Sequence, residues 1–482
     1  MRVGVDTGGT FTDVVADDGR VAKVLSTPDD PGRAVRAGVA SVPAGTTRTT
    51  GVPAAGGARP RMLAHGTTVA TNALLERRGA TVALVTSEGL RDVIEIGRQD
   101  RPSLYDQLAT RPEPLVPREL RYEVPGRLAA DGSELAPVDP AAVPAVDPAA
   151  EEVAVCLLHA DIEPAHERAV AAVLRDRGFD VTCSHEVSPE MREVERTVTT
   201  VINASLRPRL RRYLRGLDAL ADEVLVMTSS GGLLPAAVAA EVPAALLLSG
   251  PAGGVRAGGA AARANGFPDA VTFDMGGTST DVCLVLDGAP APAAERTVAG
   301  FLVRFPSLDV HTIGAGGGSI ARIDPGGALV VGPASAGADP GPACYGRGGE
   351  LPTVTDANLV AGRIPGGASF GGLALDRDAA AAALARAGVT AEGVLAVVDA
   401  NMEQALRAVS VERGVDPRGL ALVAFGGAGP LHACALADAL DMPAVLVPAR
   451  AGVLSAVGML AAPVQHDLVR TWPTPDDHEG LA

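Results

Sequence analysis

The chain has 482 residues, with 57 acidic and 41 basic side chains and a formal net charge of −16. At about 150 residues per domain, this length predicts two to four domains, and the acidic balance argues against a nucleic-acid partner, which needs a basic surface. No apolar run approaches the roughly 18 residues of a membrane-spanning helix, so no membrane partner is expected. The five cysteines lie far apart in the sequence, which indicates a reduced, cytoplasmic protein.

Lysine is almost missing from the chain, since Lys23 in the segment VAKVL is its only lysine. A Walker A phosphate loop needs a Gly-Lys-Ser/Thr triplet, so this type of nucleotide site is excluded. If the chain binds phosphate groups, their charge must therefore be offset by Mg²⁺, by backbone N–H groups or by arginine.

The first predicted unit opens with a strand, a Gly-Gly turn and a second strand. Residues 6–13 read DTGGTFTD between the apolar segments VGV and VVA, which is typical of a β-hairpin. The unit is predicted to continue through a helix at 68–78, a strand at 81–86, a proline-rich loop at 111–148, a strand at 151–159 and a helix at 164–177. A long helix at 193–217, interrupted at Pro208, is predicted to bridge to a second unit.

The second unit repeats the opening motif. Residues 274–281 read DMGGTSTD and match residues 6–13 at six of eight positions. The unit is predicted to run from a strand at 223–232 through the glycine-rich segment 249–255, a loop-rich stretch at 305–370, helices within 376–413 and the turn GGAGP at 426–430. The predicted domains are 1–190 and 191–470, followed by a frayed tail at 471–482. Because the hairpins are related, the two domains are expected to face each other.

Each hairpin carries groups that bind phosphate and a hydrated cation. Glycine turns expose backbone N–H groups, and threonine hydroxyls add donors without charge. The candidate nucleotide-binding residues are Thr7, Gly8, Gly9, Thr10, Thr12, Gly276, Gly277, Thr278, Gly426, Gly427 and Gly429. Asp6, at a strand end, is suited to hold hydrated Mg²⁺ through oxygen, and Asp274 occupies the same position in the second copy.

Longer motifs carry a family resemblance. They are HGTTVATNALLERRGA (65–80), EGLRDVIEIGRQDRPSLYD (88–106), SGPAGGV (249–255), FDMGGTSTDV (273–282), DVHTIGAGGGSIARID (309–324), VGPASAGADPGPACYGRGG (331–349) and AFGGAGPLHACALA (424–437). Two phosphate hairpins and a glycine turn resemble the actin-like ATPase fold of actin and the sugar kinases. The longer motifs resemble the hydantoinase A/5-oxoprolinase family, which includes N-methylhydantoin amidohydrolase and acetone and acetophenone carboxylase subunits.

The resemblance implies an α/β fold in which two actin-like (ribonuclease H-like) ATPase domains face each other across a nucleotide cleft. It also implies ATP-dependent activation of a poorly reactive carbonyl, usually a cyclic amide such as a hydantoin or 5-oxoproline, with ATP and Mg²⁺ as cofactors. Asp6 and Asp274 are then the expected catalytic groups, as ligands of the Mg²⁺ water or as the in-line base. Asp13 and Asp281 are expected to brace the hairpins or to cap their turns.

Family members commonly work with a hydantoinase B-type subunit, so such a partner is expected. They usually also carry a further C-terminal domain, whereas the matches here end near residue 467.

A second divalent metal is a further expectation. Asp309 and His311 are alternate residues on a short predicted strand, so both side chains point to one face, which suits binding by one oxygen and one nitrogen. Asp339 is the candidate third ligand. The alternatives are a hydrogen-bonded histidine in a loop and a turn-forming aspartate before Pro340.

Three other functions stay open at this point. The first is a carboxylase subunit, and the second is a small-molecule kinase of the same fold, which would release a stable phosphorylated product. The third is a non-catalytic regulatory module that opens and closes on ATP, with turnover unaffected by any small amide.

Overall fold

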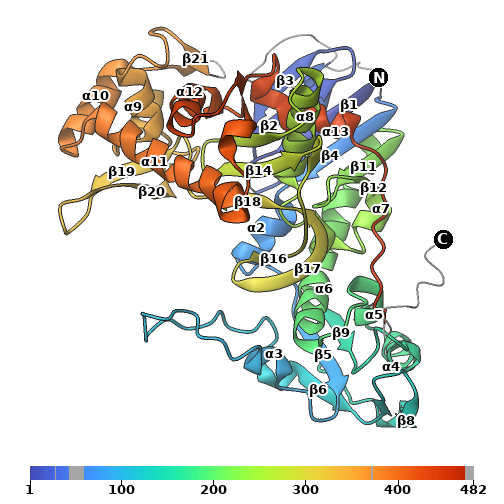
Figure 1. Cartoon of the computed structure of the whole chain (residues 1–482). Helices are drawn as coiled ribbons and strands as arrows, with labels where there is room; N and C mark the ends of the chain where they lie inside the picture. The colour runs from blue at the N-terminus through green and yellow to red at the C-terminus, as the bar shows by residue number, and fades with distance from the viewer. Residues whose placement is uncertain (28, 43–58, 371–372, 473–482) are drawn as a thin grey trace.

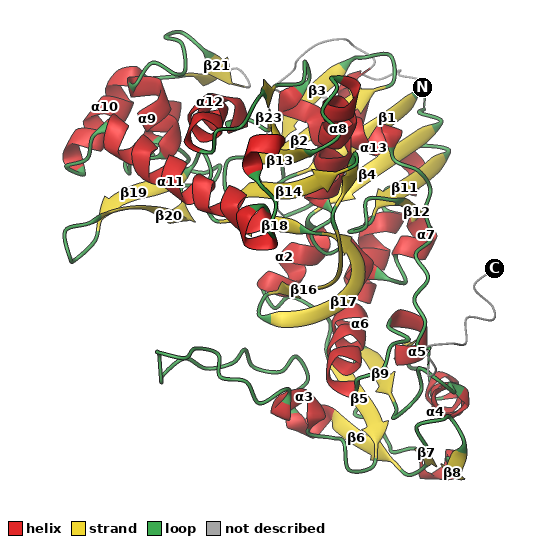
Figure 2. Cartoon of the chain, viewed as in Figure 1, coloured by secondary structure: helices red, strands yellow, loops and turns green. Residues whose placement is uncertain are grey.

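The computed structural model describes residues 1–27, 29–42, 59–370 and 373–472. Two six-stranded sheets form the centre of the main body, and a four-stranded sheet forms a smaller unit below it (Figure 1). Helices flank all three sheets, as the colouring by secondary structure shows (Figure 2). The predicted α/β class is confirmed.

The first sheet contains the N-terminal hairpin and has the strand order β12-β11-β4-β1-β2-β3. Its strands are β1 (Arg2–Thr7), β2 (Phe11–Ala16), β3 (Val21–Leu25), β4 (Met62–Thr67), β11 (Glu223–Met227) and β12 (Leu233–Pro235). It packs on α1 (Pro31–Ser41), α2 (Val69–Leu75) and the long helix α6 (Glu193–Arg215). Val3, Val5 and Val14 are fully buried, since alternate apolar side chains of β1 and β2 enter this core. Pro208, predicted to interrupt the long helix, lies within it.

The second sheet contains the repeated hairpin. Its strands are β13 (Ala270–Met275), β14 (Thr280–Leu286), β15 (Ala289–Pro290), β18 (Val310–Ile313), β23 (Ala421–Phe425) and β24 (Val445–Leu446). The helices that cover it are α8 (Gly250–Ala264), α11 (Ala391–Val409) and α12 (Gly429–Ala439). In each sheet, the first strand of the hairpin pairs with a parallel neighbour: β1 pairs with β4, and β13 pairs with β23.

Helix α13 (Leu454–Ala461) joins the two sheets, because it packs on α8 and also on β1 of the first sheet. The packing depends on glycines: a Cβ at Gly458 would lie 1.8 Å from the Gly253 carbonyl oxygen, and one at Gly4 would lie 2.2 Å from that of Ala456. No side chain fits in these gaps, so the three backbones approach closely. This contact brings the N-terminal end of α13 between the two hairpins.

The smaller unit is inserted between β4 and β11. Its strands β5 (Val82–Ser87), β6 (Arg121–Val124), β9 (Glu152–Cys156) and β10 (Val181–Cys183) are all parallel, and α4 (Ala165–Asp176) packs on β9 and β10. After α6 the chain returns to the first sheet, where β11 pairs with β4. The predicted boundary at residue 190 therefore does not separate the sheets, because residues 223–235 complete the first sheet instead of starting the second unit.

The remaining elements are peripheral. They are α3 (Val93–Ile96), β7 (Arg127–Leu128), β8 (Glu134–Ala136), α5 (Ser184–Val187), α7 (Ala236–Ala239), β16 (Pro292–Val298), β17 (Phe301–Leu308), β19 (Ser319–Ile323), β20 (Leu329–Ser335), α9 (Val354–Val360), β21 (Ser369–Phe370), β22 (Leu373–Ala374) and α10 (Arg377–Arg386). The hairpin β16–β17 crosses α6 (Figure 1), where the Arg304 amide donates a 3.0 Å hydrogen bond to Thr199 Oγ1.

The C-terminal segment runs back towards the smaller unit (Figure 1). Thr471, expected to be frayed, accepts a 2.9 Å hydrogen bond from the Met191 amide at its Oγ1. The rest of the predicted tail, 473–482, lies outside the described residues. In the described part of the chain, no single helix is long and apolar enough to span a membrane. The helical segments 377–386 and 391–413, which are bent by 82° relative to each other, reach that length and composition only when they are taken together.

Candidate active site

The two hairpins share one pairing register. In the first, Asp6 faces Asp13 and Thr7 faces Thr12 across the strands; in the second, Asp274 faces Asp281. Each turn is closed by the same type of bond: Gly8 N–H donates to the Phe11 carbonyl and Gly276 N–H to that of Ser279, both at 3.0 Å. The sequence repeat is therefore also a repeat of backbone geometry.

Both hairpin turns and the turn after β23 line one cavity of about 370 Å³. The predicted residues that line it are Asp6, Gly8, Gly9, Thr10, Asp274, Gly276, Gly277, Thr278, Gly426 and Gly427. Segments separated by more than 400 positions in the sequence thus meet in a single cleft between the two sheets. The cleft has the size of a small-molecule site.

Three predicted nucleotide-binding residues, Thr7, Thr12 and Gly429, do not line the cleft. Side chains alternate along a strand, so when Asp6 and Asp13 face the cleft, the paired Thr7 and Thr12 face the opposite side, where both are buried. Thr12 Oγ1 lies 3.1 Å from Ser26 Oγ. Gly429 begins α12 and packs behind the cleft, where a Cβ would lie 3.3 Å from the Phe273 carbonyl oxygen.

Gly426 holds the third turn against the second hairpin. Its φ of +80° is in the left-handed region, and a Cβ there would lie 2.3 Å from Asp274 Oδ1. Glycine is therefore required on two grounds, backbone conformation and space. The close approach fixes the Asp274 carboxylate beside the turn.

The first hairpin holds a carboxylate pair with one cation. Asp6 and Asp13 are half-buried in the cleft wall. Desolvation raises the pKa of both carboxyls, and for Asp6 the negative charges of Asp13 and Asp274 raise it further. Lys23 Nζ lies 2.5 Å from Asp13 Oδ1 and opposes the shift there. Asp6 has no hydrogen-bond or ion-pair partner among the described residues, so its oxygens face the cleft unengaged.

Among the described residues, no basic side chain forms an ion pair with the carboxylates of the second hairpin, although the charges of Lys23 and Arg296 lower the pKa values of Asp274 and Asp281. Desolvation, with the charges of Asp281 and Asp13, raises the pKa of Asp274 to about 7, and a hydrogen bond from Ser455 at the start of α13 partly offsets this shift. Desolvation also raises the pKa of Asp281 to about 6, against a 2.6 Å hydrogen bond from Thr312 Oγ1. A carboxylate with a pKa near 7 can both accept and release a proton at neutral pH.

The cleft is therefore anionic, with four carboxylates and one lysine. An anionic nucleotide enters such a site only with a divalent cation, and carboxylate oxygens are the ligands that Mg²⁺ prefers. The free oxygens of Asp6 and the neighbouring Asp274 form a donor set that fits this ion.

Asp309 and His311 are placed away from the cleft. The Asp309 carboxylate forms an ion pair with Arg413, and His311 lies on β18, paired with Val282. The glycines that follow them have a different task. Gly317 N–H donates to the Gly276 carbonyl at 2.9 Å and Gly318 N–H to that of Gly277 at 2.6 Å, so this loop braces the second hairpin turn.

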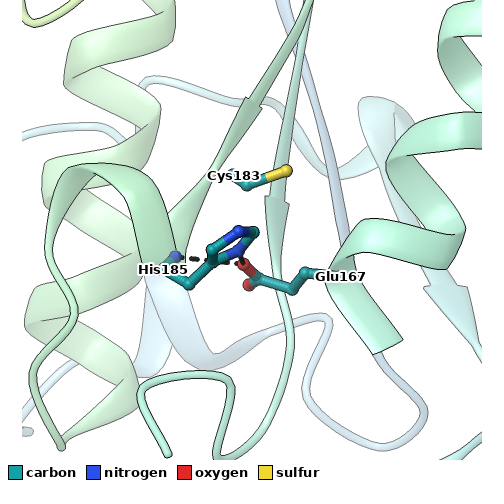
Figure 3. Close-up of side chains that lie close together, drawn as sticks. All are labelled: Glu167, Cys183 and His185. Atoms are coloured by element: carbon teal, nitrogen blue, oxygen red, sulfur yellow. Dashed lines mark hydrogen bonds and ion pairs between the residues drawn. The ribbon is translucent and has the colours of Figure 1, made fainter. Parts of the chain in front are cut away.

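Two other groups of metal-type ligands occur in the described part of the chain, Glu167–Cys183–His185 and His159–Asp161–Glu193. In the first, His185 Nδ1 lies 2.6 Å from Glu167 (Figure 3). Glu167 also accepts bonds from the amides of Leu157 and His185 and from Ser184 Oγ, so its acceptor positions are filled. In the second, Asp161 is bonded to the buried Arg196 at 2.6 Å. The Glu167 and Asp161 carboxylates are therefore engaged by protein groups.

Lys23, Tyr345, Asn358 and Ser455 also line the cleft but were not among the predicted site residues. For Lys23 a signal existed, because the only lysine of a chain is an unusual residue. Ser455 has no local signal, since its position depends on the packing of α13 between the sheets.

Two family models match the chain. The hydantoinase/oxoprolinase N-terminal region matches residues 2–178, and hydantoinase/oxoprolinase matches residues 196–468. Together they span both sheets and both hairpins.

Three curated relatives are similar over nearly the whole chain. Caprolactamase subunit alpha from Pseudomonas jessenii is 39% identical over 99% of this chain and 72% of its own length. The acetophenone carboxylase gamma subunit of Aromatoleum aromaticum is 34% identical over 96% of this chain and 68% of its own length. For 5-oxoprolinase 1 of Arabidopsis thaliana, which is 34% identical over 97% of this chain, the match spans only 42% of the relative.

Solved structures agree with the fold. The crystal structure of ATP-dependent caprolactamase from Pseudomonas jessenii has a TM-score of 0.82 at 38% identity and covers 95% of this chain and 70% of that one. Nucleotide-free acetone carboxylase has a TM-score of 0.76 at 26% identity, covering 96% and 70%. Both have actin-like ATPase-type folds, so the predicted fold is confirmed. With both family models matched along its length, the chain belongs to the hydantoinase/oxoprolinase family.

Proposed function

We propose that the chain is the ATP-dependent component of a hydrolase that phosphorylates and opens a cyclic amide, acting with a second subunit. The observation that carries this proposal is the cleft in which both DxGGT hairpins and the Gly426 turn converge. Similarity to caprolactamase subunit alpha over 99% of the chain supports a lactam, hydantoin or 5-oxoproline as the substrate class. The chain has four buried free cysteines and one exposed free cysteine, which are in keeping with a cytoplasmic location.

The cleft residues divide into three tasks. The N–H groups of Gly9 and Gly277, which make no hydrogen bond among the described residues, are placed to bind phosphate oxygens. Gly426 and Gly427 carry no side chain, so the backbone of the third turn is open for the nucleoside to approach. Asp6 and Asp274 would hold Mg²⁺, which when bound neutralises phosphate charge as the phosphoryl group transfers.

The proposed reaction consumes one ATP and two water molecules for each amide that is opened. The amide oxygen attacks the γ-phosphorus and ADP leaves. Water then adds to the activated carbon, and the C–N bond breaks to give a ring-opened acyl phosphate. A second water attacks the acyl carbon and expels phosphate together with the original amide oxygen. Asp274, which lines the cleft beside the second turn, is suited to accept a proton from an attacking water.

A partner subunit is part of the proposal, since two relatives are named as subunits of larger enzymes. We infer a hydantoinase B-type partner. A carboxylase subunit is a second candidate, favoured by the acetophenone carboxylase relative and the acetone carboxylase structure. It differs in its product, a carboxylated ketone formed with bicarbonate.

ADP release by the purified chain tests the proposal, with and without the partner subunit. The assay contains Mg²⁺-ATP and, in separate arms, caprolactam, 5-oxoproline, hydantoin, or acetone with bicarbonate. Stimulation by one cyclic amide with a ring-opened product supports the hydrolase, and stimulation only by the ketone supports the carboxylase. ATP binding without stimulation in any arm, despite the partner, would contradict both. A stable phosphorylated product would indicate a kinase.

A further inference from the structure

A second cavity, of about 450 Å³, lies among helices that pack on the first sheet and shares no lining residue with the nucleotide cleft. We call it the arginine pocket. It is lined by Asp29, Asp30, Pro31, Gly32, Arg36, Val69, Arg78, Gly79, Ala80, Glu151, Pro208, Arg209, Arg212, Tyr213 and Gly216. These residues come from the start of α1, from α2 and its connection to β5, and from the second half of α6; α2 and α6 are neighbours in Figure 1.

The wall formed by α6 is strongly basic although the chain is acidic. Residues 207–215 read RPRLRRYLR, with five arginines in nine positions. Arg207 is paired with Glu152 at 2.6 Å and Arg211 with Glu241 at 2.5 Å. In contrast, Arg209 and Arg212 have no hydrogen-bond or ion-pair partner in the described part of the chain, and both line the pocket. Two unpaired guanidinium groups thus face the same cavity from positions i and i+3.

The acidic residues of the pocket do not neutralise these arginines, because most already have other partners. Asp30 is bonded to Arg36 at 2.7 Å, and Asp29 is bonded to Arg33 at 2.9 Å. Glu151 accepts a 3.1 Å hydrogen bond from the Thr81 amide. The Thr81 amide is a neutral donor, so Glu151 keeps its charge and offsets one of the two unpaired arginines; the net charge of the pocket is therefore positive, with its free guanidinium groups on α6.

The opposite wall adds a neutral donor. Helix α1 begins at Pro31, directly after Asp29 and Asp30; its N-cap residue Asp30 makes no side-chain cap hydrogen bond, and the Ala34 amide donates to Thr27 Oγ1 at 3.2 Å. The Gly32 amide, which lines the pocket, has no acceptor among the described residues. An amide at this end of a helix favours negative charge.

Two hydrogen bonds connect the pocket residue Tyr213 with strand β1 of the active-site hairpin. Tyr213 Oη lies 2.7 Å from His65 Nε2, and His65 Nδ1 lies 3.2 Å from the Val5 carbonyl oxygen. Burial lowers the pKa of His65 to about 4, so the ring is neutral: Nδ1–H donates to Val5, and Nε2 accepts from the tyrosine. Val5 immediately precedes Asp6 on β1.

From this arrangement we infer that the arginine pocket is a second ligand site, for a small oxyanion with at least two negative charges. Phosphate and polycarboxylates share this chemistry. Guanidinium groups bind such anions with paired, charge-assisted hydrogen bonds, and the cavity volume is in the range of small-molecule sites. The site is separate from the nucleotide cleft, so the inference does not depend on the reaction proposed above.

Calorimetric titration of the full chain tests the inference, with the nucleotide cleft first saturated by Mg²⁺ and a non-hydrolysable ATP analogue. The probes are inorganic phosphate and citrate, with acetate as the monovalent comparison. One further molecule of phosphate or citrate should bind per chain and acetate should bind at least about tenfold more weakly, and a rise in salt should weaken binding. Phosphate without citrate would indicate a phosphate-sized site, and citrate without phosphate a polycarboxylate site. Absence of binding by both anions would overturn the inference.

Matched variants locate the site. Replacing Arg209 and Arg212 together by glutamine should weaken anion binding by at least about tenfold, and each single change should weaken it less. Arg215→Gln is the control, because this exposed arginine is on the same helix but does not line the pocket. Unchanged affinity in both single variants and in the double variant, or an equal loss in Arg215→Gln, would show that the anion binds elsewhere. Thermal unfolding of each variant separates lost binding from lost folding.

Discussion

The two hairpins of the cleft have the same backbone but different electrostatics. Both pair an aspartate with an aspartate at the same register position. In the first, Lys23 neutralises Asp13 and also lies 5.1 Å from the centre of the Phe11 ring. In the second, Asp281 accepts a hydrogen bond from the neutral hydroxyl of Thr312 and forms no ion pair in the described part of the chain, although the charge of Arg296 also lowers its pKa. The comparison indicates that both hairpins offer N–H groups to phosphate and hold carboxylates with raised pKa values, and that they differ in the partner of the second aspartate, a lysine for Asp13 and a hydroxyl for Asp281.

The largest expected effect follows from removing the charge of Asp274. Asp274→Asn should lower amide-stimulated ADP release by about 100-fold or more, because it removes both a metal ligand and a proton acceptor. Nucleotide binding should fall much less, since the turn N–H groups remain. Single-turnover ADP formation and equilibrium binding measure the two effects. Near-normal turnover in this variant would assign the chemistry to the first hairpin, and Asp6→Asn would then be the inactive variant.

The same aspartate should make the stability of the nucleotide-free protein depend on pH. Its pKa is raised to about 7 in the folded state, so the folded protein holds a proton that the unfolded chain releases from about pH 4 upwards. The free energy of unfolding should therefore fall between about pH 4 and pH 7 and level off above. Denaturant titrations at pH 5 and pH 8 measure this fall. In Asp274→Asn, the fall in the free energy of unfolding between these two pH values should be smaller by about 1–3 kcal/mol than in the wild type. An identical pH dependence in the variant would contradict the raised pKa.

Gly426 tests how the third turn positions the second hairpin. A methyl group there would lie 2.3 Å from Asp274 Oδ1 at a φ of +80°, so Gly426→Ala should destabilise the fold by about 1–3 kcal/mol. Gly427→Ala is the matched control for stability, because a Cβ at Gly427 meets no atom within 4 Å. Thermal unfolding compares the two variants. Equal stabilities would show that the turn moves freely away from Asp274.

Substitutions of Lys23 test the electrostatic difference between the hairpins at the first hairpin. Lys23→Met leaves Asp13 without its cation, so the affinity for Mg²⁺-ATP should fall about tenfold, or about 1.4 kcal/mol, through added repulsion in the cleft. Lys23→Arg keeps the charge and should recover most of the affinity. Equilibrium binding of the nucleotide measures both variants. If Lys23→Met binds as tightly as the wild type, the lysine has only a packing role.

Thr312→Val gives the smallest expected effect. It removes one neutral hydrogen bond to Asp281, worth about 0.5–1.5 kcal/mol, and should raise the pKa of that carboxyl. The acid limb of the pH–rate profile should shift slightly to higher pH, with turnover at pH 8 within about fivefold of wild type. A large loss at pH 8 would give Asp281 a direct role in the reaction.

Local patterns in the sequence predict much of the cleft. The repeat of DTGGTFTD in DMGGTSTD predicts two hairpins, and the structure has both with matching register. Alternation along a strand also explains why Thr7 and Thr12 face away from the cleft when Asp6 and Asp13 face it. That consequence follows from register, which composition alone does not specify.

Long-range packing accounts for what the sequence does not predict. The strand β11 pairs with β4 across an inserted unit of more than 100 residues, so no local pattern assigns residues 223–235 to the first sheet. Ser455 reaches Asp274 only because glycines let α13 pack closely on α8 and β1. Asp309, predicted as a metal ligand, is instead paired with Arg413, a residue far away in the sequence.

Isotope transfer tests the central claim most directly, that the amide oxygen attacks the γ-phosphorus of ATP. The cyclic amide that stimulates ADP release is prepared with ¹⁸O in its carbonyl group and converted by the chain with its partner subunit. Phosphoryl transfer followed by expulsion of phosphate from the acyl carbon predicts that the released phosphate carries the ¹⁸O. If the label stays entirely in the opened product and none enters phosphate, the proposed route of phosphoryl transfer to the amide oxygen followed by attack of water on the acyl carbon is contradicted.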